Sequence, residues 1–127
     1  MSESFEQAMA VRRAVLGDEY MDRVMAKTTP LNAPFQQFVT RWAWGEAWLD
    51  DTLDPQARSL LTIAMMVALN RSEELALHLR AAKNNGVTRE QIKEVLLQTA
   101  IYCGVPAANH AIKEASAIVG ELGLLKR

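Results

Sequence analysis

The sequence has little cysteine, proline and glycine, and each shortage excludes a class of protein. Cys103 is the only cysteine among 127 residues, which rules out an internal disulfide, a Cys-x-x-Cys redox pair and a multi-cysteine zinc site. Four prolines and six glycines are too few for a collagen-like chain or a linker. The longest apolar run covers residues 63–69, far below the roughly 18 residues that a membrane span needs. Residues 1–13 include two glutamates and lack the apolar segment of a secretory signal, so we expect a cytoplasmic protein.

The charges are balanced, which excludes attraction of polyanions by the molecule as a whole. Fourteen basic and fifteen acidic residues give a formal charge of -1, so we expect neither nucleic acid nor a membrane surface as a partner. Any anionic ligand must then be bound by local cations. Half of the residues are hydrophobic and 23% are charged, which is enough apolar material for one compact domain over residues 1–127.

Apolar residues recur with helical spacing, and no segment alternates as a strand would, so we predict an all-α bundle of about six to seven helices. Asp18 is expected to cap a second helix after Gly17 ends the first. Phe35, Phe38 and Trp42 predict a third helix with an aromatic stripe.

The second half of the chain predicts four further helices. A helix from Pro55 is apolar on almost every side, so we expect protein to surround it at the centre of the core. Thr88 and Gln91 have the spacing of a capping box, which predicts a helix to about Cys103. The last helix has a face of small residues that permits close packing.

His78 and Glu94 are the candidate acid–base residues. His78 lies on an apolar helical face, while Glu94 lies in a polar stripe with Gln98 and Tyr102. Each stands eight residues from Gly86, so an antiparallel hairpin would place the two level. An imidazole beside a carboxylate is suited to proton transfer near neutral pH. The alternatives are a hydrogen-bonded core histidine and a solvated stripe.

Arginines and aromatic residues are the candidates for anion binding. Arg12 continues the apolar face of the first helix, and Arg41 lies between aromatic residues that include Trp44. A guanidinium beside aromatic rings can bind a planar anion, although most arginines cover surface and most tryptophan clusters are core. His78 and His110 are too isolated to form a metal motif, so no metal site is expected.

Several segments together resemble the carboxymuconolactone decarboxylase family. The resemblance covers about residues 11–110. The segments that carry it are RRAVLG at 12–17, RWAWGE at 41–46, RSLLT at 58–62, HLRAA at 78–82, NNGVT at 84–88 and YCGVPAAN at 102–109.

The resemblance implies an all-helical fold of the alkylhydroperoxidase D-like type and a lyase without organic cofactor or metal. The implied reaction is decarboxylation of 4-carboxymuconolactone to 3-oxoadipate enol-lactone in the protocatechuate branch of the β-ketoadipate pathway. Hexameric rings are typical of the family. The resemblance suits His78 and Glu94 as catalytic residues, and Arg12, Arg41, Trp44 and Tyr102 as substrate-binding residues for a dianionic lactone.

The sequence also departs from related patterns. Aligning Glu94 with the glutamate of the alkylhydroperoxidase motif places Pro106 and Asn109 where that motif has cysteines, so the thiols of a peroxidase are missing. The stretch 46–54 is acidic where the decarboxylases have basic sequence, and it would repel a dianion. A paralogue for another small lactone or keto acid, and a non-catalytic helical assembly module, therefore remain as alternatives.

Overall fold

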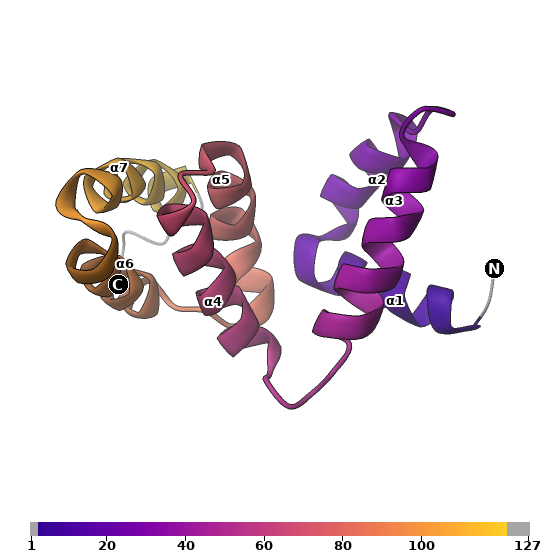
Figure 1. The fold of residues 1–127 in the computed structure, drawn as a ribbon, viewed down its shortest axis with the longest axis horizontal. Helices are drawn as coiled ribbons and strands as arrows, with labels where there is room; N and C mark the ends of the chain where they lie inside the picture. Colours follow the sequence, from indigo (N-terminus) through magenta and orange to yellow (C-terminus); the bar gives the residue numbers. More distant parts are fainter. Residues whose placement is uncertain (1–2, 122–127) are drawn as a thin grey trace. The chain divides into compact units, whose positions relative to one another are not determined.

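The computed structural model describes residues 3–121, and in this range all regular secondary structure is helical, with turns between the helices and no strand (Figure 1). The predicted all-α class is confirmed. The elements are α1 (Glu3–Leu16), α2 (Asp18–Ala26), α3 (Ala33–Val39), the π-helix η1 (Thr40–Trp48), α4 (Pro55–Ala68), α5 (Ser72–Ala81), the 3₁₀-helix η2 (Ala82–Asn85), α6 (Arg89–Cys103) and α7 (Val105–Glu121). None of the helices in this range is both long and apolar enough to cross a membrane.

The chain divides after Pro55 into two compact units. The first unit contains α1, α2, α3 and η1, and the second contains α4 to α7. The assignment of residues 1–127 to a single domain stays a prediction.

In the first unit, α1 packs closely against η1. A Cβ on Gly45 would stand 3.1 Å from the Cβ of Ala8, so glycine allows the two helices to approach. The predicted third helix is present, but it changes at Thr40 from an α-helix to a π-helix, which the sequence analysis did not predict. On this π-helix, Trp44 is buried and Trp42 is exposed.

Glycines in left-handed backbone separate several helices. Gly17 (φ 94°) is the N-cap of α2, which makes Asp18 the first helical residue and the predicted Asp18 cap wrong. Gly86 (φ 74°) ends η2, and Gly104 (φ 101°) lies between α6 and α7. L-residues with a Cβ rarely adopt this region, so glycine permits these turns.

All four α-helices of the second unit contribute to one hydrophobic core. Its buried residues are Ile63, Val67, Leu75, Leu79, Ala82, Val87, Ile92, Leu96, Ala111, Ala115 and Ile118. The backbones of α5 and α6 each lie close to α7. Ala111 and Ala115 belong to the predicted small-residue face, and their burial explains how α7 comes so close to its neighbours.

Within the single chain, protein covers only one side of α4, so the expectation that protein surrounds this helix stays a prediction. Ile63 and Val67 are buried, whereas Leu61, Met65 and Leu69 are exposed. An apolar helix in a sequence shows which side chains disfavour water, but it does not show whether the same chain covers them.

Candidate functional site

The predicted site residues are distributed over both units. Arg12, Arg41 and Trp44 belong to the first, and the remaining three belong to the second. These three are His78, Glu94 and Tyr102.

His78 lies on α5, where it is partly buried beside the core residues Leu75 and Leu79. Burial lowers the pKa of its imidazole from the ordinary value of 6.5, and the negative charge of Glu74 opposes that shift. The imidazole is therefore neutral at pH 7. A neutral imidazole has one N–H donor and one acceptor, which suits it to hydrogen-bond a developing oxyanion.

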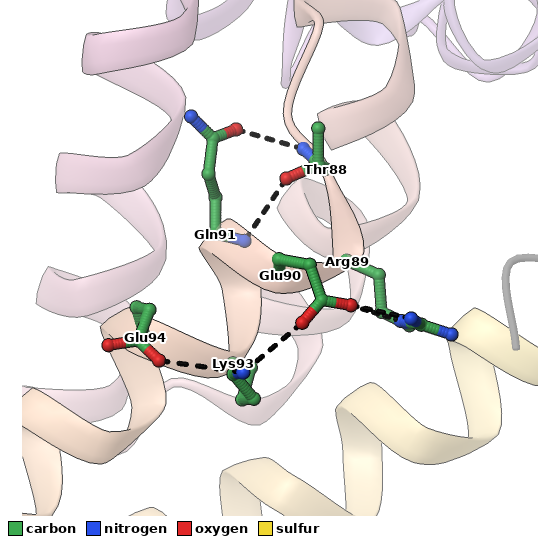
Figure 2. A network of polar contacts seen from close by, with 6 residues as sticks. All are labelled: Thr88, Arg89, Glu90, Gln91, Lys93 and Glu94. Atoms are coloured by element: carbon green, nitrogen blue, oxygen red, sulfur yellow. Dashed lines mark hydrogen bonds and ion pairs between the residues drawn. The ribbon is translucent and has the colours of Figure 1, made fainter. Parts of the chain in front are cut away.

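Glu94 lies near the start of α6, in a polar network that Figure 2 shows. Its carboxylate is 3.7 Å from the ammonium of Lys93, which also donates a hydrogen bond of 3.1 Å to Glu90. Hydrogen bonds from Arg89 and then Lys93 lower the pKa of the Glu90 carboxyl. Glu94 has no such hydrogen bond among the described contacts, and 69% of its side chain is exposed.

The same network contains the cap of α6. The Gln91 backbone N–H donates to Thr88 Oγ1 at 3.1 Å, and the Thr88 N–H donates to Gln91 Oε1 at 2.9 Å (Figure 2). The predicted capping box is confirmed. It fixes the first turn of α6 and hence the positions of Glu90 and Glu94 on that turn and the next.

Glu94 lines an open groove of about 650 Å³ in the second unit. The lining residues are Leu60, Glu90, Gln91, Glu94, Val95, Leu97, Gln98 and Ile101. Carboxylates and amides form the polar part of the groove, and aliphatic side chains form the rest. Sequence reasoning identified Glu94 and Gln98 but missed Glu90 and Gln91, which the helical spacing from Glu94 could have indicated.

The structure gives His78 and Glu94 no hydrogen bond or ion pair with each other. The carboxylate whose charge raises the pKa of His78, against the larger effect of burial, is that of Glu74, one turn earlier on α5. Tyr102 is 81% exposed near the end of α6. The joint action of His78 and Glu94 on one ligand therefore stays a prediction.

Arg12 is buried, and its guanidinium donates to neutral oxygens. Nη1 donates to Thr40 Oγ1 at 3.0 Å, and Nη2 donates to Gln36 Oε1 at 2.9 Å. Burial lowers the pKa of Arg12, with a smaller opposing effect of Tyr20. These bonds tie α1 to the junction of α3 and η1.

Arg41 and Trp44 lie on η1 in different environments. Arg41 is exposed, whereas Trp44 is buried with its ring centroid 5.0 Å from that of Trp48. Trp44 is therefore a packing residue of the first unit. Arg41 remains accessible to a ligand.

His110 and the acidic stretch 46–54 each form local polar contacts. Ser72 Oγ and His110 Nε2 are 2.7 Å apart, and Glu114 lies 4.0 Å from the same nitrogen. In the acidic stretch 46–54, the Thr52 N–H donates to Asp50 Oδ1 at 2.8 Å, which forms a local turn.

Within residues 3–121, no three His, Cys, Asp or Glu side chains are grouped as a metal site would require.

Comparisons with known proteins give consistent results. The profile of the carboxymuconolactone decarboxylase family matches residues 33–117. The chain is 42% identical over 120 residues to 4-carboxymuconolactone decarboxylase of Acinetobacter baylyi, an alignment that covers 94% of this chain and 90% of that protein. It is 42% identical over 108 residues to nitrosuccinic acid decarboxylase of Metarhizium robertsii, which covers 85% of this chain and 76% of that one. A 4-carboxymuconolactone decarboxylase sequence of Pseudomonas putida is 45% identical over 42 residues, 33% of this chain and 88% of that sequence.

Proposed function

Because the chain belongs to the carboxymuconolactone decarboxylase family, we propose that it is a carboxy-lyase that converts 4-carboxymuconolactone to 3-oxoadipate enol-lactone and carbon dioxide. The observation that carries this proposal is the 42% identity to the Acinetobacter baylyi enzyme over 94% of the chain. The match covers nearly the whole of both proteins, so it includes each of the candidate site residues.

The chemistry of the substrate explains why the reaction proceeds on protein side chains alone. The departing carboxylate is on the γ carbon of an unsaturated lactone. When the bond to it breaks, the electron pair moves through the double bond to the lactone carbonyl, and carbon dioxide leaves. The resulting dienolate then takes a proton at its α carbon. The protein has to stabilise the dienolate oxygen, deliver that proton and hold the second carboxylate.

His78 is the residue that we assign to the dienolate oxygen. Its neutral imidazole keeps one N–H donor, and its partial burial strengthens a hydrogen bond from that donor relative to water. A single donor to an oxyanion contributes roughly 10²–10³ in rate.

Glu94 is assigned to proton delivery from the groove on the second unit. Its carboxyl is exposed to solvent, and the capping box fixes the start of the helix that carries it. A placed general acid contributes roughly 10²–10⁴ in rate. Tyr102 is proposed to shape the pocket that the lactone enters.

Arg41 is the stronger candidate for the second carboxylate. It is exposed and lies inside the region that the family profile matches, whereas Arg12 is buried and lies outside that region. Trp44 is proposed to hold Arg41 in position indirectly, because its buried ring anchors η1, the helix that also carries Arg41. The planar fork of an arginine matches a carboxylate in a way that lysine does not.

A second candidate function follows from the relative in Metarhizium robertsii. That protein is named a nitrosuccinic acid decarboxylase and is as similar to this chain over the aligned region. Nitrosuccinic acid is also a small dicarboxylic acid with its own electron sink, because a nitro group accepts the electron pair that decarboxylation leaves. The same side chains would serve either substrate.

The deciding experiment compares both substrates on the purified protein. Freshly prepared 4-carboxymuconolactone and nitrosuccinate are incubated separately with enzyme and a chelator, and carbon dioxide release is followed. We expect turnover of the lactone, with kcat/KM at least tenfold above that for nitrosuccinate. The reverse ranking would assign the chain to the second function, and no release from either would overturn both and leave a paralogue with another substrate or a non-catalytic module.

We also propose that the protein acts in protocatechuate catabolism in the cytoplasm and assembles as a homohexameric ring. The family resemblance supports these assignments. Large apolar side chains exposed on α4 and α6, among them Leu61, Met65 and Ile101, support assembly in particular, because a soluble monomer rarely leaves such a surface uncovered.

A further inference from the structure

The groove that contains Glu94 has acids in its lining but no base. Glu90 and Glu94 are its charged lining residues, and no lysine, arginine or histidine of the described chain lines it. A ligand with two carboxylates would meet two further carboxylates there, and like charges at close range repel each other. The groove by itself therefore lacks the cation that the reaction proposed above requires.

The cations on α6 itself do not fill this role. Arg89 and Lys93 both donate hydrogen bonds to the Glu90 carboxylate, and the Lys93 ammonium also lies 3.7 Å from Glu94 (Figure 2). Both side chains line a separate, smaller cavity together with residues of α7, among them Ile112. They offset the negative charge of α6, but a cation that binds a ligand in the groove has to come from another element.

Arg41 is an exposed cation with exposed aromatic rings beside it. Arg41 and Trp42 follow Phe38 by three and four residues, so the three side chains lie on one side of the helix formed by α3 and η1. Phe38 is 60% exposed and Trp42 is 53% exposed. Within residues 3–121, no hydrogen bond or ion pair involves the Arg41 guanidinium. Because protein interfaces are enriched in aromatic rings and arginine, this aromatic face of Phe38, Arg41 and Trp42 is suited to contact a partner.

The groove and the aromatic face are complementary in charge and polarity. On α6, the exposed aliphatic side chains Leu97 and Ile101 line the groove together with Glu94. Packing aromatic rings against these aliphatic groups would exclude water, which strengthens the attraction between the Arg41 guanidinium and a carboxylate. Both surfaces are exposed in the single chain, so we assign the contact to two copies.

A contact between these surfaces also fits a ring. The groove and the aromatic face are different surfaces of one chain, so their contact is heterologous, and heterologous contacts close into rings when the rotation between copies permits it. Each copy would bind one neighbour through its groove and another through its aromatic face.

We propose that Arg41 of the partner subunit completes the Glu94 groove, with the aromatic face of that subunit packed on Leu97 and Ile101. The guanidinium balances the carboxylates of the groove and binds the substrate carboxylate that does not react. This use of the site rests on the proposed function, whereas the contact between the two surfaces does not. The candidate active site is therefore shared between two copies, and one chain alone lacks its substrate-binding cation.

A cross-linking experiment tests the contact without relying on activity. Cys103 is the only cysteine and is exposed, so every variant carries Cys103→Ser. Arg41→Cys is co-expressed with a tagged copy that carries Glu94→Cys, and the purified assembly is treated with a short bismaleimide. We expect a covalent dimer of one tagged and one untagged chain. In the matched control, Arg23→Cys replaces Arg41→Cys and should give no dimer, because Arg23 is an exposed arginine of the same unit outside the aromatic face.

Three cross-linking results would overturn the contact. A bridge that forms only when Arg41→Cys and Glu94→Cys are in one chain would place Arg41 beside its own groove. No bridge in either arrangement, with normal circular dichroism, would mean that the two surfaces do not meet. An equal yield with Arg23→Cys would show that the bridge does not depend on the aromatic face.

Mixed assemblies test whether the shared site is used in catalysis. Arg41→Ala and Glu94→Gln should each lower kcat/KM on 4-carboxymuconolactone at least roughly tenfold. When both variants mix at random in one assembly, about a quarter of the grooves combine an intact Glu94 with an intact Arg41 of the other variant, so kcat/KM should rise to about a quarter of the wild-type value.

The outcomes separate this inference from the proposed function. A mixture no more active than its two parents would overturn the shared site even if the wild-type protein is a decarboxylase. A wild-type protein without activity on either substrate would overturn the proposed function, and the cross-link would still decide whether Arg41 of the partner subunit reaches the groove.

Discussion

At the scale of the residue, His78 makes the stability of the fold depend on pH. Burial lowers the pKa of its imidazole below 6.5, so as pH falls the unfolded chain binds a proton before the folded one does. The neutral imidazole contributes fully to the free energy of unfolding above pH 6.5. This contribution is lost as the pH falls from 6.5 to the pKa of His78 in the folded protein. We expect the free energy of unfolding, measured with urea between pH 7.5 and 5, to fall less steeply in His78→Gln. The same replacement of His110 should leave the contribution of His78 in place, and identical slopes in wild type and His78→Gln would contradict this account.

The catalytic role of His78 gives a second prediction. His78→Gln should lower kcat at least tenfold with little change in KM, because the hydrogen bond to the dienolate oxygen forms mainly in the transition state. Steady-state rates on 4-carboxymuconolactone measure this, with circular dichroism to confirm the fold. Glu74→Gln is the control, since it removes the charge that opposes the pKa shift but leaves the imidazole present. A variant with normal turnover would remove His78 from the mechanism.

The role proposed for Arg41 predicts an effect on substrate binding. Arg41→Lys should raise KM several-fold for a substrate with two carboxylates, because a planar fork of donors is replaced by a point charge. Arg23→Lys is the matched control, since Arg23 is an exposed arginine of the same unit that pairs with Glu19 at 3.0 Å. If both variants keep the wild-type KM, another cation of the chain binds the second carboxylate.

At the scale of the element, the capping box of α6 is worth a measurable share of stability. Thr88→Ala removes the side-chain acceptor for the Gln91 N–H and should lower the free energy of unfolding by about 1 kcal/mol. Urea denaturation measures the change. Thr28→Ala is the control, because exposed Thr28 donates to the Val24 carbonyl instead of capping a helix, and its effect should stay within about 0.5 kcal/mol. Equal effects of the two substitutions would show that the cap does not stabilise α6.

The capping box also shows which elements could be predicted from the sequence. Thr88 and Gln91 act on each other across three residues, so the sequence contains the whole interaction. The π-helix was missed because no residue spacing in the sequence marks it. The packing of η1 against α1, where Gly45 meets Ala8, likewise joins distant parts of the chain. Asp18 was misassigned as a cap because Gly17 can also occupy that position through a backbone conformation that composition does not reveal.

At the scale of the whole molecule, the candidate site was predictable by residue type more than by arrangement. His78 stood out because an imidazole on an apolar face is unusual, and the structure gives it the lowered pKa that partial burial causes. The bonds of Arg12 to Gln36 and Thr40 join residues 24 and 28 positions apart, and no sequence spacing indicates such contacts. The expected hairpin placed His78 level with Glu94 by counting from Gly86, but α5 and α6 both lie closest to α7, a neighbour that the counting left out.

Assembly is the property that belongs to the molecule as a whole. Ile101 on α6 is 78% exposed in the single chain, and Leu97 on the same helix is 55% exposed. Each large aliphatic side chain that an interface buries contributes about 1.5–3 kcal/mol, whereas an aspartate there would have to lose its hydration. We therefore expect Ile101→Asp to shift the protein to smaller species in light scattering coupled to size-exclusion chromatography, with unchanged helical content by circular dichroism. Leu31→Asp serves as the control, because Leu31 is 91% exposed between α2 and α3, outside the apolar surface of α4 and α6. Two outcomes would contradict this: a wild-type protein that is already monomeric, or an Ile101→Asp variant of unchanged mass. Either would mean that this surface of α6 is exposed to solvent and forms no interface between subunits.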